Sequence, residues 1–295
     1  MELNILKGTY IVAVSGGVDS VALLHMLHMQ CLSPDYTFIV AHYDHGIRTD
    51  SDMDAKLVAA LAHNYGMAYE KGSGHLGLNV SEDTARAKRY EFLRDTMNKH
   101  SATAIITAHH QDDLLETILL HVQRGTGRQG LSPMSRTADI VRPLLPYTKN
   151  EIVGYAKQHS LRWNEDSTNS DTKYARNKLR HMLAKSLTDS KRHQLHDLYK
   201  DMLSANSESD MLAAGIVSAI TNDNGEIVRS RFVTLPFSVA CECTKLWLHT
   251  EGVNTVDKRL IMRCAIAIKT LQIGKRIDCL SGRFLVSQKT TVKIM

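Results

Sequence analysis

The stretch Ser15–Ser20, SGGVDS, decides the fold, because it lies between an apolar β-branched run and a helical pattern. The run before it, Tyr10–Val14 (YIVAV), predicts a strand, and Val21, Leu24 and Leu27 after it recur at helical spacing. Glycines in such a turn let backbone N–H groups approach a phosphate closely, and the positive end of the next helix adds to the attraction. The stretch therefore predicts a phosphate-binding loop, with a plain turn capped by Ser or Asp as the alternative.

Short apolar runs alternate with helical patterns over the first 160 residues. Further strands are expected at Thr37–Ala41, Ala68–Glu70, Ala104–Thr107 and Ile140–Val141, and helices near Leu57–Ala62, after Ser81, and at Asp112–Val122 and Lys149–His159. Strands that are apolar without alternation are typical of a parallel sheet that helices cover on both faces. We therefore expect an α/β fold with a doubly wound parallel sheet, in which ligands bind at the carboxyl ends of the strands.

The pattern changes near residue 185. Beyond it the sequence predicts a helix over Leu187–Val217, a strand over Glu226–Leu235, helices over Phe237–His249 and Val256–Leu271, and a terminal hairpin over Arg283–Ile294. Two domains are expected: residues 1–185 form the α/β domain, and residues 186–295 form a smaller, mainly helical α+β domain.

Positive charge is concentrated in the C-terminal third. The formal net charge of the 295-residue chain is +5, and residues 186–295 hold 15 Lys and Arg against 11 Asp and Glu. Such an excess is compatible with a phosphate-rich partner, although an ordinary solvated surface can carry it as well.

The cysteines and apolar runs argue against several classes of protein. Five scattered cysteines without a C-x-x-C pair support no disulfide framework, structural zinc or cysteine-held iron–sulfur cluster. Cys241 and Cys243 are expected in the core. No apolar run reaches the roughly 18 residues of a membrane span, and the N-terminus shows no signal-peptide pattern. We expect a cytoplasmic protein with no membrane partner.

One glycine pattern is misleading. Gly125–Gly130 (GTGRQG) matches the dinucleotide motif G-x-G-x-x-G, but it follows an expected helix rather than a strand. A flexible loop near the active site is therefore favoured over an NAD site. The chain also lacks the Walker pattern of kinases and GTPases.

Polar side chains follow the second expected strand. His42, Asp44, His45 and Arg48 lie in the segment HYDHGIR, at the strand end that faces the same crevice as the glycine loop. These residue types can bind phosphate, a metal ion or the edges of bases. A polar loop with one structural histidine is the alternative.

Two carboxylates follow the fourth expected strand. Asp113 and Glu116 are spaced i, i+3 on one helical face, which suits Mg²⁺ or an ammonium group. His109, His110 and Asp112 beside them also invite a zinc interpretation. The alternative is that the helix dipole favours acidic residues in any first turn.

Arginines recur at helical spacing in two further segments. Arg86 and Arg89 are three residues apart in ARAKRYEF, and Arg176 and Arg180 are four apart in YARNKLR, so each pair shares one side of a helix. Guanidinium groups suit phosphates and base edges, while solvated salt bridges are the alternative.

The order of these blocks resembles the tRNA(Ile)-lysidine synthetase family of the N-type ATP pyrophosphatase (PP-loop) superfamily. The loop SGGVDS is followed over about residues 10–183 by HYDHGIR, ARAKRYEF, TAHHQDDLLET, RGTGRQGLSPM, VRPLLP, EDSTN and YARNKLR. The chain departs from the family pattern at Gln111, Leu114 and Leu115, which flank the carboxylates without removing them. The C-terminal third matches loosely, as a short version with one accessory domain.

The resemblance implies a ligase that modifies the wobble cytidine of an isoleucine tRNA with a CAU anticodon. ATP, the co-substrate, would adenylate O2 of the cytidine and release pyrophosphate, and the ε-amine of free L-lysine would then attack C2 and displace AMP. Adenylation makes O2 a good leaving group, and the attacking amine must be unprotonated. Residues 1–185 would be the catalytic domain and residues 186–295 a tRNA-binding accessory domain, and a homodimer is suggested.

The same resemblance assigns roles to residues of this sequence. The ATP phosphates would be held by Ser15, Gly16, Gly17, Asp19 and Ser20, with Asp19 as the ligand of Mg²⁺. ATP would also be bound by His45, Arg89 and His109. Lysine and tRNA would be bound by Arg48, Asp113, Glu116, Arg176 and Arg180. The catalytic residues would be Asp19, Arg89, Asp113 and Glu116.

Two other classes stay open. A tRNA-thiolating relative that depends on an iron–sulfur cluster would carry cysteine pairs, which this sequence lacks. A catalytically dead module that binds tRNA or a nucleotide would not need the intact carboxylates and glycine loop.

Overall fold

The computed structural model describes residues 1–30, 33–44, 46, 51–74, 82–134, 139–164, 179, 183, 187–253, 256–279 and 282–295. The chain forms two compact units, Met1–Met202 and Leu203–Met295, which divide inside the long helix α7 (Asp189–Ile220). The change of pattern near residue 185 therefore does not coincide with the division by contacts. As a functional boundary, residue 185 stays a prediction.

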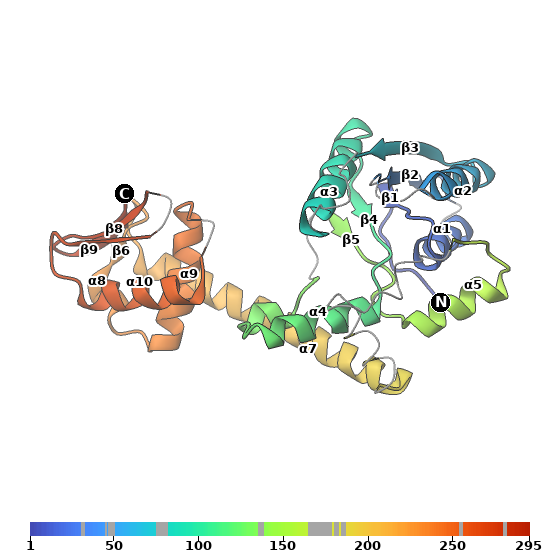
Figure 1. Cartoon of the computed structure of the whole chain (residues 1–295). Helices are drawn as coiled ribbons and strands as arrows, with labels where there is room; N and C mark the ends of the chain where they lie inside the picture. The colour runs from blue at the N-terminus through green and yellow to red at the C-terminus, as the bar shows by residue number, and fades with distance from the viewer. Residues whose placement is uncertain are drawn as a thin grey trace. The chain divides into compact units, whose positions relative to one another are not determined.

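Five parallel strands form the sheet of the first unit (Figure 1), in the order β3-β2-β1-β4-β5. They are β1 (Gly8–Ala13), β2 (Tyr36–Asp44), β3 (Ala68–Ser73), β4 (Ala104–Ile106) and β5 (Ile140–Val141). Ile11 of β1 pairs with Ile39 of β2 and Ile105 of β4. The strand order reverses between β1 and β4, and ligands of doubly wound sheets bind at the carboxyl ends of the strands at such a reversal. The predicted fold class is confirmed.

Helices cover both faces of this sheet (Figure 1). The helices of this unit are α1 (Val18–Gln30), α2 (Ser51–Asn64), α3 (Glu82–Lys99), α4 (Gln111–Gln123) and α5 (Lys149–Gln158), of which α1, α2 and α5 cover one face and α3 covers the other. On one face, Val12 packs with Leu24 in a core to which α1, α2 and α5 contribute. On the other face, Ile11 and Ile105 pack with Leu93 of α3. Because both side-chain directions of β1 are buried, its sequence is apolar without alternation.

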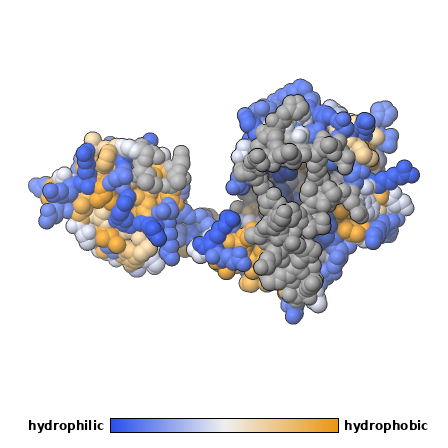
Figure 2. Space-filling model, in the orientation of Figure 1, coloured by the Kyte–Doolittle hydropathy of each residue, from blue (hydrophilic) through white to orange (hydrophobic). Residues whose placement is uncertain are grey.

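The second unit combines helices with a small antiparallel sheet of order β6-β9-β8-β7. Beyond α7 its elements are β6 (Ile227–Val228), α8 (Arg229–Phe232), α9 (Phe237–Thr250), α10 (Lys258–Thr270), β7 (Arg276–Asp278), β8 (Phe284–Ser287) and β9 (Thr291–Ile294). Trp247 and Phe232 are buried at its core with Cys243, while Cys241 is half-buried. Apolar side chains also reach the surface of this unit (Figure 2), among them Phe237 and Ile266.

One predicted strand of the second unit is wrong. Glu226–Leu235 was expected to be a single strand, but only Ile227–Val228 pairs with β9, and the chain then turns into α8. The helical turn is closed by the bond from the amide of Val233 to the carbonyl oxygen of Arg229, at 3.0 Å. This turn buries Phe232 fully and leaves Val233 exposed.

The segment after α4 forms a tight turn followed by a short 3-10 helix, Arg128–Leu131. His121 Nδ1 lies 2.8 Å from the carbonyl oxygen of Gly130 and joins the end of α4 to this turn. Across the described helices of the chain, none is both long and apolar enough to cross a bilayer.

Candidate active site

The loop after β1 is held in shape by its own serines. Ser20 Oγ donates to the carbonyl oxygen of Gly17 at 2.9 Å and accepts from the amide of Ser15 at 3.2 Å. Gly16 has a φ of +96°, and a Cβ there would lie 3.1 Å from Oδ1 of Asp54, so this turn requires glycine. Helix α1 begins directly after the loop, which brings the positive end of the helix to the backbone of the turn.

Two residues outside the predicted set support the loop from its flank. Asn164 Nδ2 donates to Oδ1 of Asp54 at 2.7 Å, and the amide of Asn164 donates to the carbonyl oxygen of Gly16 at 3.1 Å. Asp54 comes from α2, 110 residues before Asn164. No local spacing links two residues so far apart, so the sequence carried no signal for this pair.

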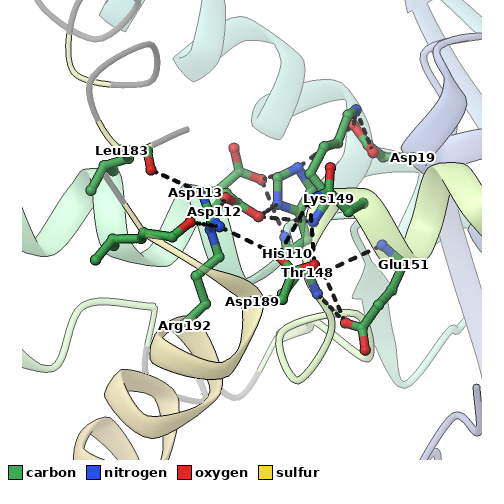
Figure 3. A network of polar contacts seen from close by, with 12 residues as sticks. Asp19, His110, Asp112, Asp113, Thr148, Lys149, Glu151, Leu183, Asp189 and Arg192 are labelled. Atoms are coloured by element: carbon green, nitrogen blue, oxygen red, sulfur yellow. Dashed lines mark hydrogen bonds and ion pairs between the residues drawn. The ribbon is translucent and has the colours of Figure 1, made fainter. Parts of the chain in front are cut away.

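Asp19 of α1 is paired with a lysine from α5 (Figure 3). Lys149 Nζ lies 2.6 Å and 2.7 Å from the two carboxylate oxygens of Asp19. Lys149 is the first residue of α5, whose N-cap Thr148 forms a capping box with Glu151. The backbone N–H of Lys149 donates to Oδ2 of Asp112 at 2.8 Å. The helix begins at Lys149 as predicted, but the contact of Lys149 with the loop was not predicted. The available signal was that a helix following β5 begins at the ligand-binding edge of the sheet.

His110 lies between the phosphate loop and the start of α4. Its Nε2 is 3.7 Å from Oδ2 of Asp19 and 3.5 Å from Oδ2 of Asp113, and its side chain is only 6% exposed. The backbone N–H of His110 also donates to Oδ2 of Asp113 at 3.2 Å. The structure therefore brings Asp19 of α1 and Asp113 of α4, between which five strands and helices lie along the chain, to one nitrogen of the same imidazole.

The second predicted carboxylate follows one turn further along α4. Glu116 is fully buried, while the side chain of Asp113 is 18% exposed. Their i, i+3 spacing places both on one side of α4. A carboxylate pair that is open at one end and enclosed at the other suits a ligand that presents a single cationic group.

His109 has a different environment from its neighbour. Its Nδ1 lies 2.8 Å from Oγ1 of Thr107. Burial is the main cause that lowers the pKa of His109 to about 3; the charge of Asp113 opposes this shift, and the charges of Arg142, Arg86 and Arg89 contribute to it. The imidazole is therefore neutral at physiological pH and can bind a ligand as a neutral donor or acceptor.

The two arginines predicted on α3, together with Arg94, gather around one aromatic ring. The guanidinium carbons of Arg86, Arg89 and Arg94 lie 5.0, 5.5 and 5.7 Å from the ring centroid of Tyr90. Cation–π contacts of this kind hold guanidinium groups in place. Arg86 and Arg89 thus share one side of α3, as their spacing predicted, and concentrate positive charge on the side of the site that contains His109.

A buried arginine from α7 completes the polar network (Figure 3). Arg192 Nε lies 2.8 Å from Oδ1 of Asp112, and Nη2 donates to the carbonyl oxygen of Leu183 at 3.0 Å. Arg192 also bonds to Asp189 and to the carbonyl oxygen of Leu187. Neither Asp112 nor Arg192 was predicted as part of a phosphate or lysine site, because each acts on the site only through its neighbours.

Four predicted site residues lie outside the residues that the structure describes: His45, Arg48, Arg176 and Arg180. Their assignments stay predictions.

The geometry defines what this site can bind. Asp19 near the start of α1 contacts both Lys149 at the start of α5 and His110 at the start of α4, so the N-terminal ends of these three helices lie close together. The N-terminal ends of helices attract phosphate. Mg²⁺ is usually held by one or two carboxylates together with substrate phosphates. Asp19, which already accepts a cation, fits that pattern. A cluster of three or more metal-binding side chains does not occur among the described residues.

Comparison with known proteins agrees with this geometry. Residues 4–187 match the PP-loop domain family. A tRNA(Ile)-lysidine synthase of Exiguobacterium sibiricum is 36% identical over 193 residues, covering 64% of this chain and 45% of that protein. Another, from Thermotoga sp., is 31% identical over 289 residues, covering 93% of this chain and 67% of that protein. Among solved structures, a U34-tRNA thiolase from Methanococcus maripaludis aligns with a TM-score of 0.55 at 15% identity, over 68% of this chain and 74% of that chain, which shows the fold alone.

The parallel sheet and the glycine loop at its reversal point define a PP-loop protein. The chain belongs to the PP-loop family and, within it, to the tRNA(Ile)-lysidine synthase family. It spans less than half the length of some of these relatives, 45% of one and 41% of another.

Proposed function

We propose that the chain joins L-lysine to the wobble cytidine of an isoleucine tRNA with a CAU anticodon, with ATP as the co-substrate. The observation that carries the proposal is the convergence of Asp19 and Asp113 on Nε2 of His110, at 3.7 Å and 3.5 Å. A loop suited to nucleotide phosphates thereby adjoins a carboxylate pair suited to an ammonium group. The names of the relatives support lysine and tRNA as the substrates.

In the first step, O2 of the cytidine attacks the α-phosphorus of ATP. The O2–P bond forms, the bond from this phosphorus to the bridging oxygen breaks, and pyrophosphate leaves with the electron pair. The loop Ser15–Ser20 binds the phosphates through its N–H and hydroxyl groups. The hydrogen bonds of Ser20 with Ser15 and Gly17 support this role, because they hold the loop in shape. Arg89 counters the charge that develops on the transferred group. Asp19 would hold Mg²⁺, which would further neutralise the charge of the phosphates.

In the second step, the ε-amine of lysine attacks C2 of the adenylated cytidine. The C2–N bond forms, the C2–O2 bond breaks, and O2 leaves as part of AMP. Asp113 and Glu116 bind the ammonium group of lysine and take up the proton that the amine must lose. The partial exposure of Asp113 supports this assignment, because a ligand can reach this carboxylate, while Glu116 is fully buried one turn further along α4.

The remaining assignments extend the same proposal. His109 contacts ATP as a neutral imidazole, which its lowered pKa supports. The family resemblance supports the roles at ATP or tRNA that are predicted for His45, Arg48, Arg176 and Arg180. It also supports a homodimer and a cytoplasmic location. The positive charge of residues 186–295 supports contacts between their Lys and Arg side chains and tRNA.

The test is a reaction of the purified chain with ATP, Mg²⁺, radiolabelled lysine and an isoleucine tRNA transcript with a CAU anticodon. We expect label in the tRNA, matched by AMP release and lost when the wobble base is uridine. Pyrophosphate release without label would reject lysine as the nucleophile. No reaction at all would favour a module that only binds tRNA or a nucleotide.

A further inference from the structure

Lys149 contacts the phosphate loop through an ion pair with Asp19. Its ammonium contacts both carboxylate oxygens of Asp19, at 2.6 Å and 2.7 Å (Figure 3). The pair joins the start of α5 to the start of α1, 130 residues earlier. Neither the glycine-loop motif nor the carboxylate motif contains this lysine, so its contact with Asp19 is seen only in the tertiary structure.

The backbone of Lys149 is anchored, whereas its side chain can change partner. The amide of Lys149 is bound to Asp112 at 2.8 Å, and the capping box of Thr148 and Glu151 holds the first turn of α5. The side chain is 40% exposed, and a lysine stem of four carbons has rotatable bonds throughout. The ammonium group can therefore move over a few ångströms while its base stays at the edge of the loop.

Charge gives a reason for that movement. Asp19 and the phosphates of ATP are all anions, so a nucleotide entering the loop is repelled by Asp19 unless a cation lies between them. In this structure that cation is the ammonium of Lys149. Asp19 would also be the carboxylate that holds Mg²⁺, so this ion would compete with the ammonium of Lys149 for the same oxygens. The displaced ammonium then lies beside the phosphates.

We infer that Lys149 is a further catalytic residue of the first step: its ammonium leaves Asp19 when ATP binds and pairs with the pyrophosphate part of the nucleotide. When the bond between the α-phosphorus and the bridging oxygen breaks, that oxygen keeps the electron pair, and Lys149 stabilises the negative charge that accumulates on pyrophosphate. Without a bound nucleotide, the same lysine neutralises Asp19. The inference rests on the proposed function, since it concerns the adenylation step of that reaction.

The test compares three variants of the full chain. Lys149→Met removes the charge and keeps the length of the side chain, and Lys149→Arg restores a cation. Lys157→Met is the matched control, because Lys157 is exposed in the last turn of the same helix. Pyrophosphate release is measured in a single turnover with ATP, Mg²⁺ and tRNA, without lysine. We expect Lys149→Met to be slower by about 10²-fold, Lys149→Arg to recover most of the rate, and Lys157→Met to match the unaltered chain.

Two further measurements separate this role from a structural one. Labelled lysine, added after adenylated tRNA has accumulated, should be transferred by Lys149→Met at the unaltered rate. Mn²⁺, used as a probe without nucleotide and followed by electron paramagnetic resonance, should bind Lys149→Met more tightly than the unaltered chain, because no ammonium competes for Asp19.

Two results would overturn the inference. Unchanged pyrophosphate release by Lys149→Met overturns the inference, and so does equal slowing of both steps with unchanged Mn²⁺ binding. If the unaltered chain releases no pyrophosphate with tRNA, the proposed function fails instead, and the Mn²⁺ measurement still decides whether Lys149 competes at Asp19.

Discussion

Arg192 Nε lies 2.8 Å from Oδ1 of Asp112, and this contact ties the start of α7 to the start of α4. The other oxygen of the same carboxylate accepts the backbone N–H of Lys149 at 2.8 Å, at the start of α5. One carboxylate therefore fixes three helices around the candidate site. Asp113 and Lys149 depend on it for their positions, although Asp112 itself contacts neither a predicted phosphate site nor the carboxylate pair.

Loss of this contact should destabilise the chain. Arg192→Met leaves Asp112 without the guanidinium in a place where the arginine side chain is only 6% exposed. Breaking a buried pair by removing one partner leaves an uncompensated charge, so we expect the free energy of unfolding to fall by about 3 kcal/mol. Urea denaturation followed by circular dichroism measures it. Lys191→Met, at the exposed neighbouring position, is the control, and an equal effect of both variants would contradict the prediction.

The turn at Gly16 should not tolerate a side chain. Gly16→Ala requires alanine at a φ of +96° with its Cβ 3.1 Å from Asp54. Strain of this kind distorts the turn, so we expect affinity for ATP to fall roughly tenfold or more. Isothermal titration calorimetry with a non-hydrolysable ATP analogue measures this affinity.

Gly154→Ala is the matched control, because Gly154 lies within α5 with no other atom within 4 Å of an added Cβ. There alanine should raise the free energy of unfolding by about 0.5–1 kcal/mol and leave ATP affinity unchanged. Equal ATP binding by Gly16→Ala and Gly154→Ala would refute the role given to the turn.

The pH dependence of stability should report on His109. Its pKa is lowered from 6.5 to about 3 in the folded chain, chiefly by burial. Between these values the unfolded chain binds a proton that the folded chain does not, so the free energy of unfolding falls as the pH falls. The slope from this residue is up to about 1.4 kcal/mol per pH unit.

His109→Gln should therefore flatten the profile between about pH 4 and pH 6 by up to that slope. Urea denaturation at a series of pH values tests this. His63→Gln, at an exposed position on α2, serves as the comparison. A profile of His109→Gln that runs parallel to that of the unaltered chain would show that His109 is protonated in both states alike.

Asp113 should act on lysine and not on ATP. Asp113→Asn removes the charge at the open end of the carboxylate pair, so the lysine concentration for half-maximal labelling should rise about tenfold or more. Pyrophosphate release with tRNA and without lysine should persist. Glu91→Gln, in an exposed ion pair with Lys88 on α3, controls for a general loss of negative charge. A loss of pyrophosphate release in Asp113→Asn would place this carboxylate in the first step.

Local patterns were sufficient for most elements of the first unit. The apolar run Tyr10–Val14, the glycine turn and the helical spacing after it correspond to β1, the loop and α1. The prediction of one strand over Glu226–Leu235 was wrong because the β-branched and aromatic residues of this segment have a high propensity for strands. In the structure, Arg229–Phe232 form a helical turn in which Phe232 is buried. Propensity is a weak preference that packing overrides.

The sequence by itself determined the class of sheet, the phosphate loop and the carboxylate pair on α4, because each depends on residues that are close along the chain. Only the tertiary structure decided which residues meet there. Lys149 reaches Asp19 across 130 residues, and Arg192 reaches Asp112 across 80. The direction of a helix and the strand after which it begins set such contacts, and neither leaves a periodic signal in the sequence.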